Sequence, residues 1–282
     1  MILIADSGST KTDWVLIKSL EERVTFQSIG LNPLFITDDT EYQLQNVFDS
    51  VLNRELVSSI YFFGSGCGTP SRIKVIENFL RFICPGAKIV VESDLLGAAI
   101  SLFGNNAGIA CILGTGSNSG VFDGEKITDK QVSLGYILGD EGSAASMVKN
   151  FYKALFYNTL PGEVAEAYFQ NSGLSKDDII DNIYRKPFPN RFLATQLQYI
   201  IPIKNDNCVK AIINESLTSF FDIHIKYQET SYLEMGFVGS LAWYFKDEIH
   251  HIAKQRGLNV SKIIRYPIDE MVTYYSRITF SN

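Results

Sequence analysis

Residues 107–122 read AGIACILGTGSNSGVF, an apolar run that ends in a turn of glycine, threonine, serine and asparagine. Ala107 to Leu113 have the length and composition of a buried strand, and Gly120 to Phe122 begin the next strand. In the turn between them, Gly114 to Ser119, the glycines let backbone N–H groups approach an anion closely, and the hydroxyls add donors. The stretch therefore predicts a strand, a phosphate-binding turn and a second strand.

The same stretch lies in the longest charge-free run of the chain, Leu95 to Phe122, which is long enough to cross a bilayer. Gly104-Asn105-Asn106 and the turn after Leu113 interrupt its apolar surface, so a membrane-spanning helix is not predicted. Met1 to Ala5 are apolar but follow no basic segment, which argues against a signal peptide or an anchor. We therefore expect a cytoplasmic protein without a membrane partner.

A second turn of similar chemistry, Asp6 to Thr12, follows the first apolar strand of the chain and precedes another strand. Asp6 is placed to hold a hard cation that accompanies phosphates, directly or through water. The turn lacks the Gly-x-x-x-x-Gly-Lys-Ser/Thr pattern and is followed by a strand, so it is not a Walker A loop. An ordinary hairpin is the alternative for this turn alone, but the two turns together suit a nucleotide between two halves. Gly236 to Ser240 form a third, weaker candidate for nucleotide contact.

The first hundred residues alternate in the manner of a mixed α/β sheet, with three strands joined by short turns and then two helix-plus-strand units. The strands are expected near 1–5, 14–17, 24–29, 59–63 and 88–91, with helices that begin after Thr37 and at Pro70. This is the layout of a ribonuclease H-like domain. A similar opening returns after Asn106, so we expect an N-terminal domain over 1–106 and a C-terminal domain over 107–282, the latter mainly helical between 140 and 221.

Composition narrows the functional classes. The chain has 282 residues, and 25 Lys and Arg against 31 Asp and Glu give a net charge of −6, which disfavours binding to long nucleic acid. Its four cysteines, Cys67, Cys84, Cys111 and Cys208, are scattered, without the close pairs of a zinc site or a cysteine-ligated cluster. We expect them to be reduced thiols in the core.

These motifs resemble the BadF/BadG/BcrA/BcrD group of the actin, sugar kinase and heat-shock ATPase superfamily, and within it the N-acetylglucosamine kinases. The resemblance covers nearly the whole chain and rests on Asp6–Lys11, Gly30–Pro33, Glu92–Asp94, Leu113–Asn118 and Gly139–Ser143. It implies two ribonuclease H-like (actin-like ATPase) domains around a nucleotide cleft, the second enlarged by helices. It also implies ATP and Mg²⁺ as cofactors and a small-molecule sugar as substrate, and it leaves a homodimer open.

The resemblance assigns roles to individual residues. Asp94 matches the carboxylate that accepts the proton of the attacking sugar hydroxyl. Asp6 stays the expected metal ligand because of its place at the end of a strand. The expected nucleotide contacts are Gly8, Ser9, Thr10, Lys11, Thr115, Gly116, Gly239 and Ser240. The expected sugar contacts are Asn32, Ser117, Asn118, Gly135 and Asp140.

Several points stay open at the level of sequence. Asp94 also suits a helix cap, because a helical pattern begins at Leu95. Ser133-Leu134-Gly135-Tyr136 stands where the animal kinases carry Gly-Trp-Gly, so the acetamido pocket is undetermined, and the first phosphate turn has fewer glycines than is usual. The chain could instead be an ATPase that activates a dehydratase-type enzyme, which the scattered cysteines disfavour, or a non-catalytic sensor of sugar or nucleotide.

Overall fold

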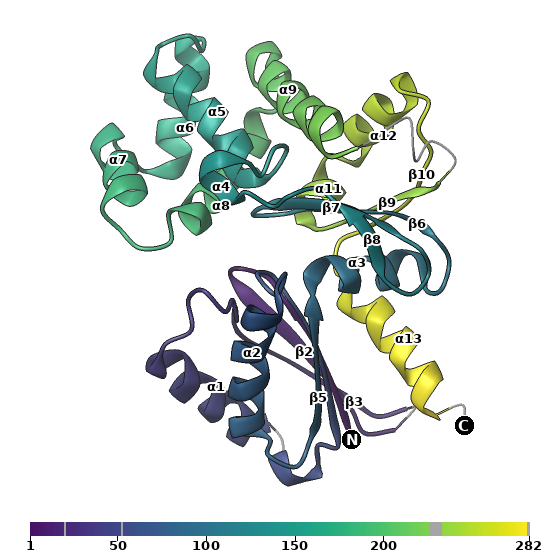
Figure 1. Ribbon diagram of the computed structural model, residues 1–282. Helices are drawn as coiled ribbons and strands as arrows, with labels where there is room; N and C mark the ends of the chain where they lie inside the picture. The colour runs from purple at the N-terminus through teal and green to yellow at the C-terminus, as the bar shows by residue number, and fades with distance from the viewer. Residues whose placement is uncertain (20, 52, 226–232, 281–282) are drawn as a thin grey trace. The chain divides into compact units, whose positions relative to one another are not determined.

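The computed structural model describes residues 1–19, 21–51, 53–225 and 233–280 (Figure 1). The chain forms two compact units. Unit 1 comprises Met1–Gly108, Phe122–Thr128 and Tyr266–Asn282, and unit 2 comprises Ile109–Val121 and Asp129–Arg265. The chain first leaves unit 1 close to the predicted boundary at residue 106. It differs from the predicted division at its end, because residues from Tyr266 onward pack with unit 1. That residues 1–106 and 107–282 form two related halves stays a prediction.

Unit 1 is built on a five-stranded sheet of order β3-β2-β1-β4-β5. Its strands are β1 (Ile2–Ser7), β2 (Lys11–Ile17), β3 (Arg23–Ile29), β4 (Ser59–Gly64) and β5 (Lys88–Ser93), and its other elements are α1 (Asp38–Val51), η1 (Arg54–Leu56), α2 (Pro70–Ile83), α3 (Asp94–Phe103) and α13 (Ile268–Phe280). β2 is antiparallel to β1 and β3, whereas β1, β4 and β5 are parallel. The strands and helices predicted for this part of the chain are confirmed.

One face of this sheet is covered by α1 and α2, and an aromatic cluster lies between the sheet and α1. Trp14 of β2 and Phe48 of α1 meet edge to face with ring centroids 5.0 Å apart, and Trp14 lies 6.0 Å from Phe62 of β4. All three side chains are at most 1% exposed. Successive strand residues point to opposite faces, which is why Phe62 joins this cluster while its neighbours Tyr61 and Phe63 do not.

The opposite face carries α3 and the C-terminal helix α13 (Figure 1). Tyr275 of α13 stacks on Tyr61 with centroids 4.3 Å apart and lies 5.9 Å from Phe63. This aromatic burial places α13 in unit 1 although it ends the chain. Chain order alone assigned it to the C-terminal domain, because a pattern of apolar residues does not say which sheet it covers.

Unit 2 contains most of a second five-stranded sheet, of order β10-β9-β6-β7-β8, whose strand residues Gly108, Phe122, Ile127 and Thr128 belong to unit 1. Its strands are β6 (Gly108–Leu113), β7 (Ser117–Phe122), β8 (Ile127–Lys130), β9 (Met235–Val238) and β10 (Val260–Ile264). From its other edge the order is β8-β7-β6-β9-β10. Three strands consecutive in the chain are followed by two later strands, as in the order β3-β2-β1-β4-β5 of the first sheet. The two parallel pairs β6–β9 and β9–β10 correspond to β1–β4 and β4–β5.

Helices inserted between β8 and β9 enlarge unit 2, as the sequence predicts. They are α4 (Gly135–Leu138), α5 (Ala144–Phe156), α6 (Gly162–Ser172), α7 (Lys176–Tyr184), α8 (Pro189–Ile200), η2 (Ile201–Ile203) and α9 (Asn207–His224), with α11 (Ser240–Tyr244) and α12 (Lys246–Gln255) following β9. Alternate residues of β6 share a core with α5 and α9. The buried hydroxyls of Tyr152 and Tyr168 pair at 2.6 Å, and Tyr168 donates to Gln196 Oε1 at 3.1 Å. Among the described residues, none of the helices has the length and apolarity to cross a membrane.

The observed start of β7 differs from the predicted one, and this difference affects the candidate site. β7 begins at Ser117 rather than at Gly120, so Ser117, Asn118 and Ser119 belong to a strand and not to the turn. The side chains of Ser117 and Ser119 are buried and that of Asn118 is half-buried, which is the alternation of a strand. Polar residues of low strand propensity conceal this pattern in the sequence.

We expect Phe48→Ala to lower the free energy of unfolding by about 3–5 kcal/mol, because the change leaves a cavity beside Trp14. Phe82→Ala on α2 is the matched control: this side chain is 60% exposed and its loss should cost less than about 1 kcal/mol. Urea denaturation followed by tryptophan fluorescence measures both. Equal effects of the two substitutions would contradict the assignment of Phe48 to the core of unit 1.

Candidate active site

The candidate residues of unit 1 gather at one edge of its sheet. The parallel strands β1, β4 and β5 end in register at Ser7, Gly64 and Ser93. The turn after β1 and the residue after β5, Asp94, therefore follow strand ends that meet at the same edge. In open α/β sheets this carboxyl edge is where ligands bind.

The first turn is held by a close backbone approach. Gly30 N–H donates to Thr10 O at 3.1 Å, and a Cβ on Gly30 would lie 2.5 Å from Gly8 O and 2.8 Å from Ser9 O. No side chain fits there, so the turn lies directly on the backbone after β3. Gly8 and Thr10 are exposed and Ser9 is half-buried, which leaves the turn open to a ligand.

Ser7 fastens the base of this turn. Its buried Oγ pairs with Thr12 Oγ1 at 2.8 Å and accepts a hydrogen bond from Leu31 N–H at 3.0 Å. Ser7 O accepts from Ser65 N–H at 2.8 Å, which ties the turn to the loop after β4. The sequence singled out Ser7 as part of a phosphate turn, whereas in the structure it is a buried structural residue.

Three carboxylates lie close together at this edge. Asp6 stands directly opposite Asp13 in the β1–β2 ladder, and Asp94 is near enough to act on it electrostatically. Burial is the main cause that raises the pKa of Asp6 to about 7, and the charges of Asp13 and Asp94 add to it. Lys11 opposes this shift. Such a site favours a divalent cation, which neutralises the repulsion.

Asp13 also holds the lysine of the first turn. Lys11 Nζ lies 2.8 Å from Asp13 Oδ2 and 5.4 Å from the centre of the Tyr266 ring, and Gln27 Nε2 donates to Asp13 Oδ1 at 2.6 Å. Lys11 would therefore have to leave Asp13 to meet a phosphate. Sequence inspection missed Asp13; the signal was the short turn, which pairs Asp6 with the residue seven positions later if the strands form a hairpin.

Asp94 opens α3 but does not cap it. The N-cap is Ser93, whose Oγ accepts from Leu96 N–H at 3.3 Å, and Asp94 is the first helical residue. Asp94 Oδ1 accepts a hydrogen bond from Leu95 N–H at 2.9 Å. The alternative role of Asp94 as the cap is therefore wrong.

Asn32 lies in the same region of unit 1. It is 7% exposed, and its Oδ1 accepts from Leu34 N–H at 3.0 Å. Its amide packs against Gly66 in the loop after β4, where a Cβ would come within 2.6 Å of Asn32 Oδ1. Cys67 lies in the same loop. Its burial is the main cause that raises the pKa of the thiol to about 12, and the charges of Asp94 and Glu92 add to this shift. The loop thus places a neutral thiol near Asp94.

The candidate residues of unit 2 surround the turn between β6 and β7. Gly114 O and Thr115 O accept hydrogen bonds from the first N–H groups of α5, those of Ala144 and Ala145, at 2.9 and 3.3 Å. Gly239 has φ of +124°, and a Cβ there would lie 2.3 Å from Leu113 O. The third candidate segment is therefore packed on the second turn. Ser240 is exposed and begins α11, which has only five residues.

Asp140 lies against this turn. Its Oδ1 is 3.5 Å from Ser117 N, and a Cβ on Gly116 would lie 2.9 Å from its Oδ2. Asp140 has φ of +59°, a left-handed conformation that costs a non-glycine residue about 1–3 kcal/mol. Burial raises the pKa of Asp140, opposed by the Ser117 N–H and Lys149. A strained, half-buried acid is typical of a functional site.

Ser117 adds a second sign of function. Its Oγ is buried and has no hydrogen-bond partner in the part of the chain that the structure describes. A hydroxyl in this state costs about 1–3 kcal/mol, which a ligand group can recover. The half-buried Asn118 accepts a hydrogen bond from Ser119 N–H at its Oδ1. Gly135, with φ of +72°, starts α4, and Gly139 N–H donates to Gly135 O.

Lys149 acts on Asp140 and His224 on its neighbour Glu141, two roles that the sequence did not reveal. Lys149 Nζ donates to Tyr136 O and acts electrostatically on Asp140 and Glu141; burial lowers the pKa of Lys149 and these carboxylates oppose the shift. His224 Nε2 lies 3.3 Å from Glu141 Oε2. Their positions on α5 and α9 become visible only once these helices pack.

No group of three or more His, Cys, Asp and Glu side chains within the described ranges is arranged to hold a metal ion by itself. Mg²⁺ commonly takes only one or two carboxylates and completes its shell with water and phosphate oxygens. The acidic oxygens around Asp6 fit a magnesium ion that arrives with a nucleotide. Cys67, Cys84 and Cys111 are buried, as expected, whereas Cys208 is half-buried.

No family model matches the chain. The crystal structure of a candidate N-acetylglucosamine kinase from Porphyromonas gingivalis is similar to it with a TM-score of 0.92 and 36% sequence identity, over 98% of this chain and 99% of that one. The chain belongs to this N-acetylglucosamine kinase-like family. Membership places it among the sugar kinases.

Three other proteins are less similar to this chain than the Porphyromonas protein is. The N-acetylmuramic acid/N-acetylglucosamine kinase of Clostridium acetobutylicum is 25% identical over 238 residues, covering 77% of this chain and 75% of that protein. A candidate N-acetylglucosamine kinase from Chromobacterium violaceum has a TM-score of 0.76 at 16% identity, covering 97% and 98%, and the ROK hexokinase of Thermus thermophilus 0.51 at 13%, covering 99% of both chains. These two show the fold alone. The predicted fold class, two actin-like ATPase domains, is confirmed.

We expect Gly30→Ala in this kinase-like chain to lower the free energy of unfolding by about 1–3 kcal/mol and to displace the first turn, because the atoms in its way are backbone. Gly86→Ala is the matched control, since a Cβ there meets nothing within 4 Å. Denaturation and hydrogen exchange of residues 7–12 measure the two effects. A Gly30→Ala protein indistinguishable from the control would disprove the close approach.

Proposed function

We propose that the chain transfers the γ-phosphoryl group of ATP, with Mg²⁺, to the primary hydroxyl of an amino sugar of the N-acetylglucosamine class. The observation that carries this proposal is the edge of unit 1 where Asp94, no longer needed as a helix cap, lies near Asp6 and the first turn. The 36% identical relative is named as a candidate N-acetylglucosamine kinase, and the Clostridium relative as a kinase of that sugar and N-acetylmuramic acid.

Asp94 is the proposed general base. A carboxylate that accepts the proton of the attacking hydroxyl makes the oxygen a stronger nucleophile as it reaches the γ-phosphorus. Asp6 would hold Mg²⁺, which supplies charge neutralisation at the phosphates when it is bound. The proposed nucleotide contacts are Gly8, Ser9, Thr10, Lys11, Thr115, Gly116, Gly239 and Ser240.

The proposed sugar contacts are Asn32, Ser117, Asn118, Gly135 and Asp140, which offer hydrogen-bond donors and acceptors. Support comes from the unpaired Oγ of Ser117 and from the strained Asp140, whose carboxylate accepts hydrogen bonds. A pyranose presents several hydroxyls that each need such partners. We also propose that the chain belongs to the BadF/BadG/BcrA/BcrD group, while a homodimer and a cytoplasmic location stay predictions.

The direct test is ADP release over a panel of N-acetylglucosamine, N-acetylmuramic acid, glucosamine and glucose, with Mg²⁺ and ATP. We expect turnover with N-acetylglucosamine above that with glucose, and none when Mg²⁺ is chelated. ATP binding without ADP release for every sugar would overturn the kinase proposal, and sugar binding by calorimetry in that case would favour a non-catalytic sensor.

We expect Asp94→Asn to lower kcat by about 10²–10⁴-fold, because the amide cannot accept the hydroxyl proton. ATP affinity and the thermal unfolding midpoint should stay near those of the unchanged protein, since Asn retains an oxygen for Leu95 N–H. Asp39→Asn, an exposed carboxylate on α1, is the matched control. Full turnover by Asp94→Asn would remove Asp94 from the role of base.

A further inference from the structure

A buried histidine stands behind the proposed sugar-binding residues of unit 2. His224 ends α9 and is 8% exposed, and its Nε2 lies 3.3 Å from Glu141 Oε2. Burial lowers the pKa of His224 although Glu141 opposes the shift, so the neutral imidazole can donate Nε2–H to the Glu141 carboxylate. The ring also stacks on Phe220, with centroids 4.7 Å apart and planes inclined by 14°.

Helix α9 also packs against Gly142, the residue after Glu141. A Cβ on Gly142 would lie 2.6 Å from Phe220 Cβ, and Gly142 has φ of +74°. On the other side of Glu141, Asp140 has φ of +59°. The segment thus has two left-handed residues, a conformation that persists only where surrounding contacts enforce it. His224 and Phe220, one helical turn apart on α9, supply such contacts.

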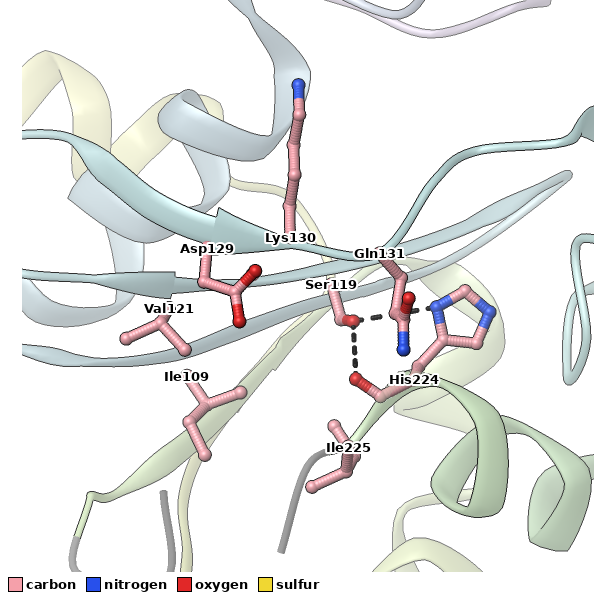
Figure 2. Close-up of a pocket in the computed structure, with 9 residues that line it drawn as sticks. Ile109, Ser119, Val121, Asp129, Lys130, Gln131, His224 and Ile225 are labelled. Atoms are coloured by element: carbon pink, nitrogen blue, oxygen red, sulfur yellow. Dashed lines mark hydrogen bonds between the residues drawn. The ribbon is translucent and has the colours of Figure 1, made fainter. Parts of the chain in front are cut away.

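His224 is also tied to β7. Ser119 Oγ donates to His224 O at 3.0 Å and lies 3.5 Å from His224 Nδ1 (Figure 2). Ser119 is 1% exposed and follows Ser117 and Asn118, two of the proposed sugar contacts. His224 therefore touches both strand β7 and the segment that carries Asp140, which are joined directly by the contact of Asp140 with Ser117 N–H.

We propose that His224 is a positioning residue for the sugar site: through Glu141 and Ser119 it holds Asp140 and the start of β7 in the arrangement that binds the sugar. This role rests on the proposed function for its effect on kinetics. The residue does not contact the sugar. Its removal acts more on sugar binding than on ATP binding, because Asp140 and Ser117 are proposed sugar contacts, whereas the first turn, Gly239 and Ser240 supply most of the proposed ATP contacts.

The test compares two substitutions of His224. Leu removes the hydrogen bond to Glu141, whereas Gln can still donate to it. We expect His224→Leu to raise the KM for the sugar about tenfold or more, with the KM for ATP changed less than about twofold, and His224→Gln to recover most of the loss. Phe221→Leu is the matched control, because it disturbs the same helix through its contact with Phe237 and should leave the sugar KM unchanged.

The rate of amide hydrogen exchange of residues 139–143, measured without substrates, is a second test that does not depend on kinase activity. We expect faster exchange in His224→Leu and in Glu141→Ala, which removes the same bond from its other end and serves if His224→Leu does not fold. Unchanged exchange and sugar KM would overturn the role, as would an equal rise in both KM values. If the unchanged protein phosphorylates no sugar, the proposed function fails and the exchange rates alone decide the role of His224.

Discussion

The parallel pairing of β1 with β4 and of β4 with β5 is the constraint on which the candidate site of unit 1 depends. Because the three strands run in one direction and in register, the residues after their ends come to one edge. Asp6, the loop after Gly64 and Asp94 are far apart in the chain and meet only through this pairing. The equivalent pairing of β6 with β9 brings Gly239 to the turn after Leu113 in unit 2.

Close backbone contacts convert these edges into defined turns. The turn at Gly8 and Ser9 rests on Gly30, and Leu113 O rests on Gly239, at distances that leave no room for a side chain. Neither contact adds a charged group. Each fixes where a backbone lies, which is what a phosphate-binding turn requires if N–H groups are to converge on an anion. The acidic group around Asp6 and the strained Asp140 then supply the charges.

Much of unit 1 could be predicted from the sequence because its strands are short apolar runs bounded by Gly, Pro and acidic residues. The start of β7 could not, because Ser117, Asn118 and Ser119 have the composition of a turn. The place of α13 could not either, since its apolar side fits any sheet until Tyr275 meets Tyr61. Asp13 was missed because its importance comes from the cross-strand register with Asp6.

Most of the order of elements, the two turns of small polar residues and the position of Asp94 after a buried strand follow from the sequence, because local composition and spacing encode them. That Ser93 rather than Asp94 caps α3, and that Lys11 pairs with Asp13, emerges only in the folded chain. The contact of His224 with Glu141 likewise emerges only there. These facts depend on which side chains meet across strands and helices, and packing, not local propensity, sets those distances.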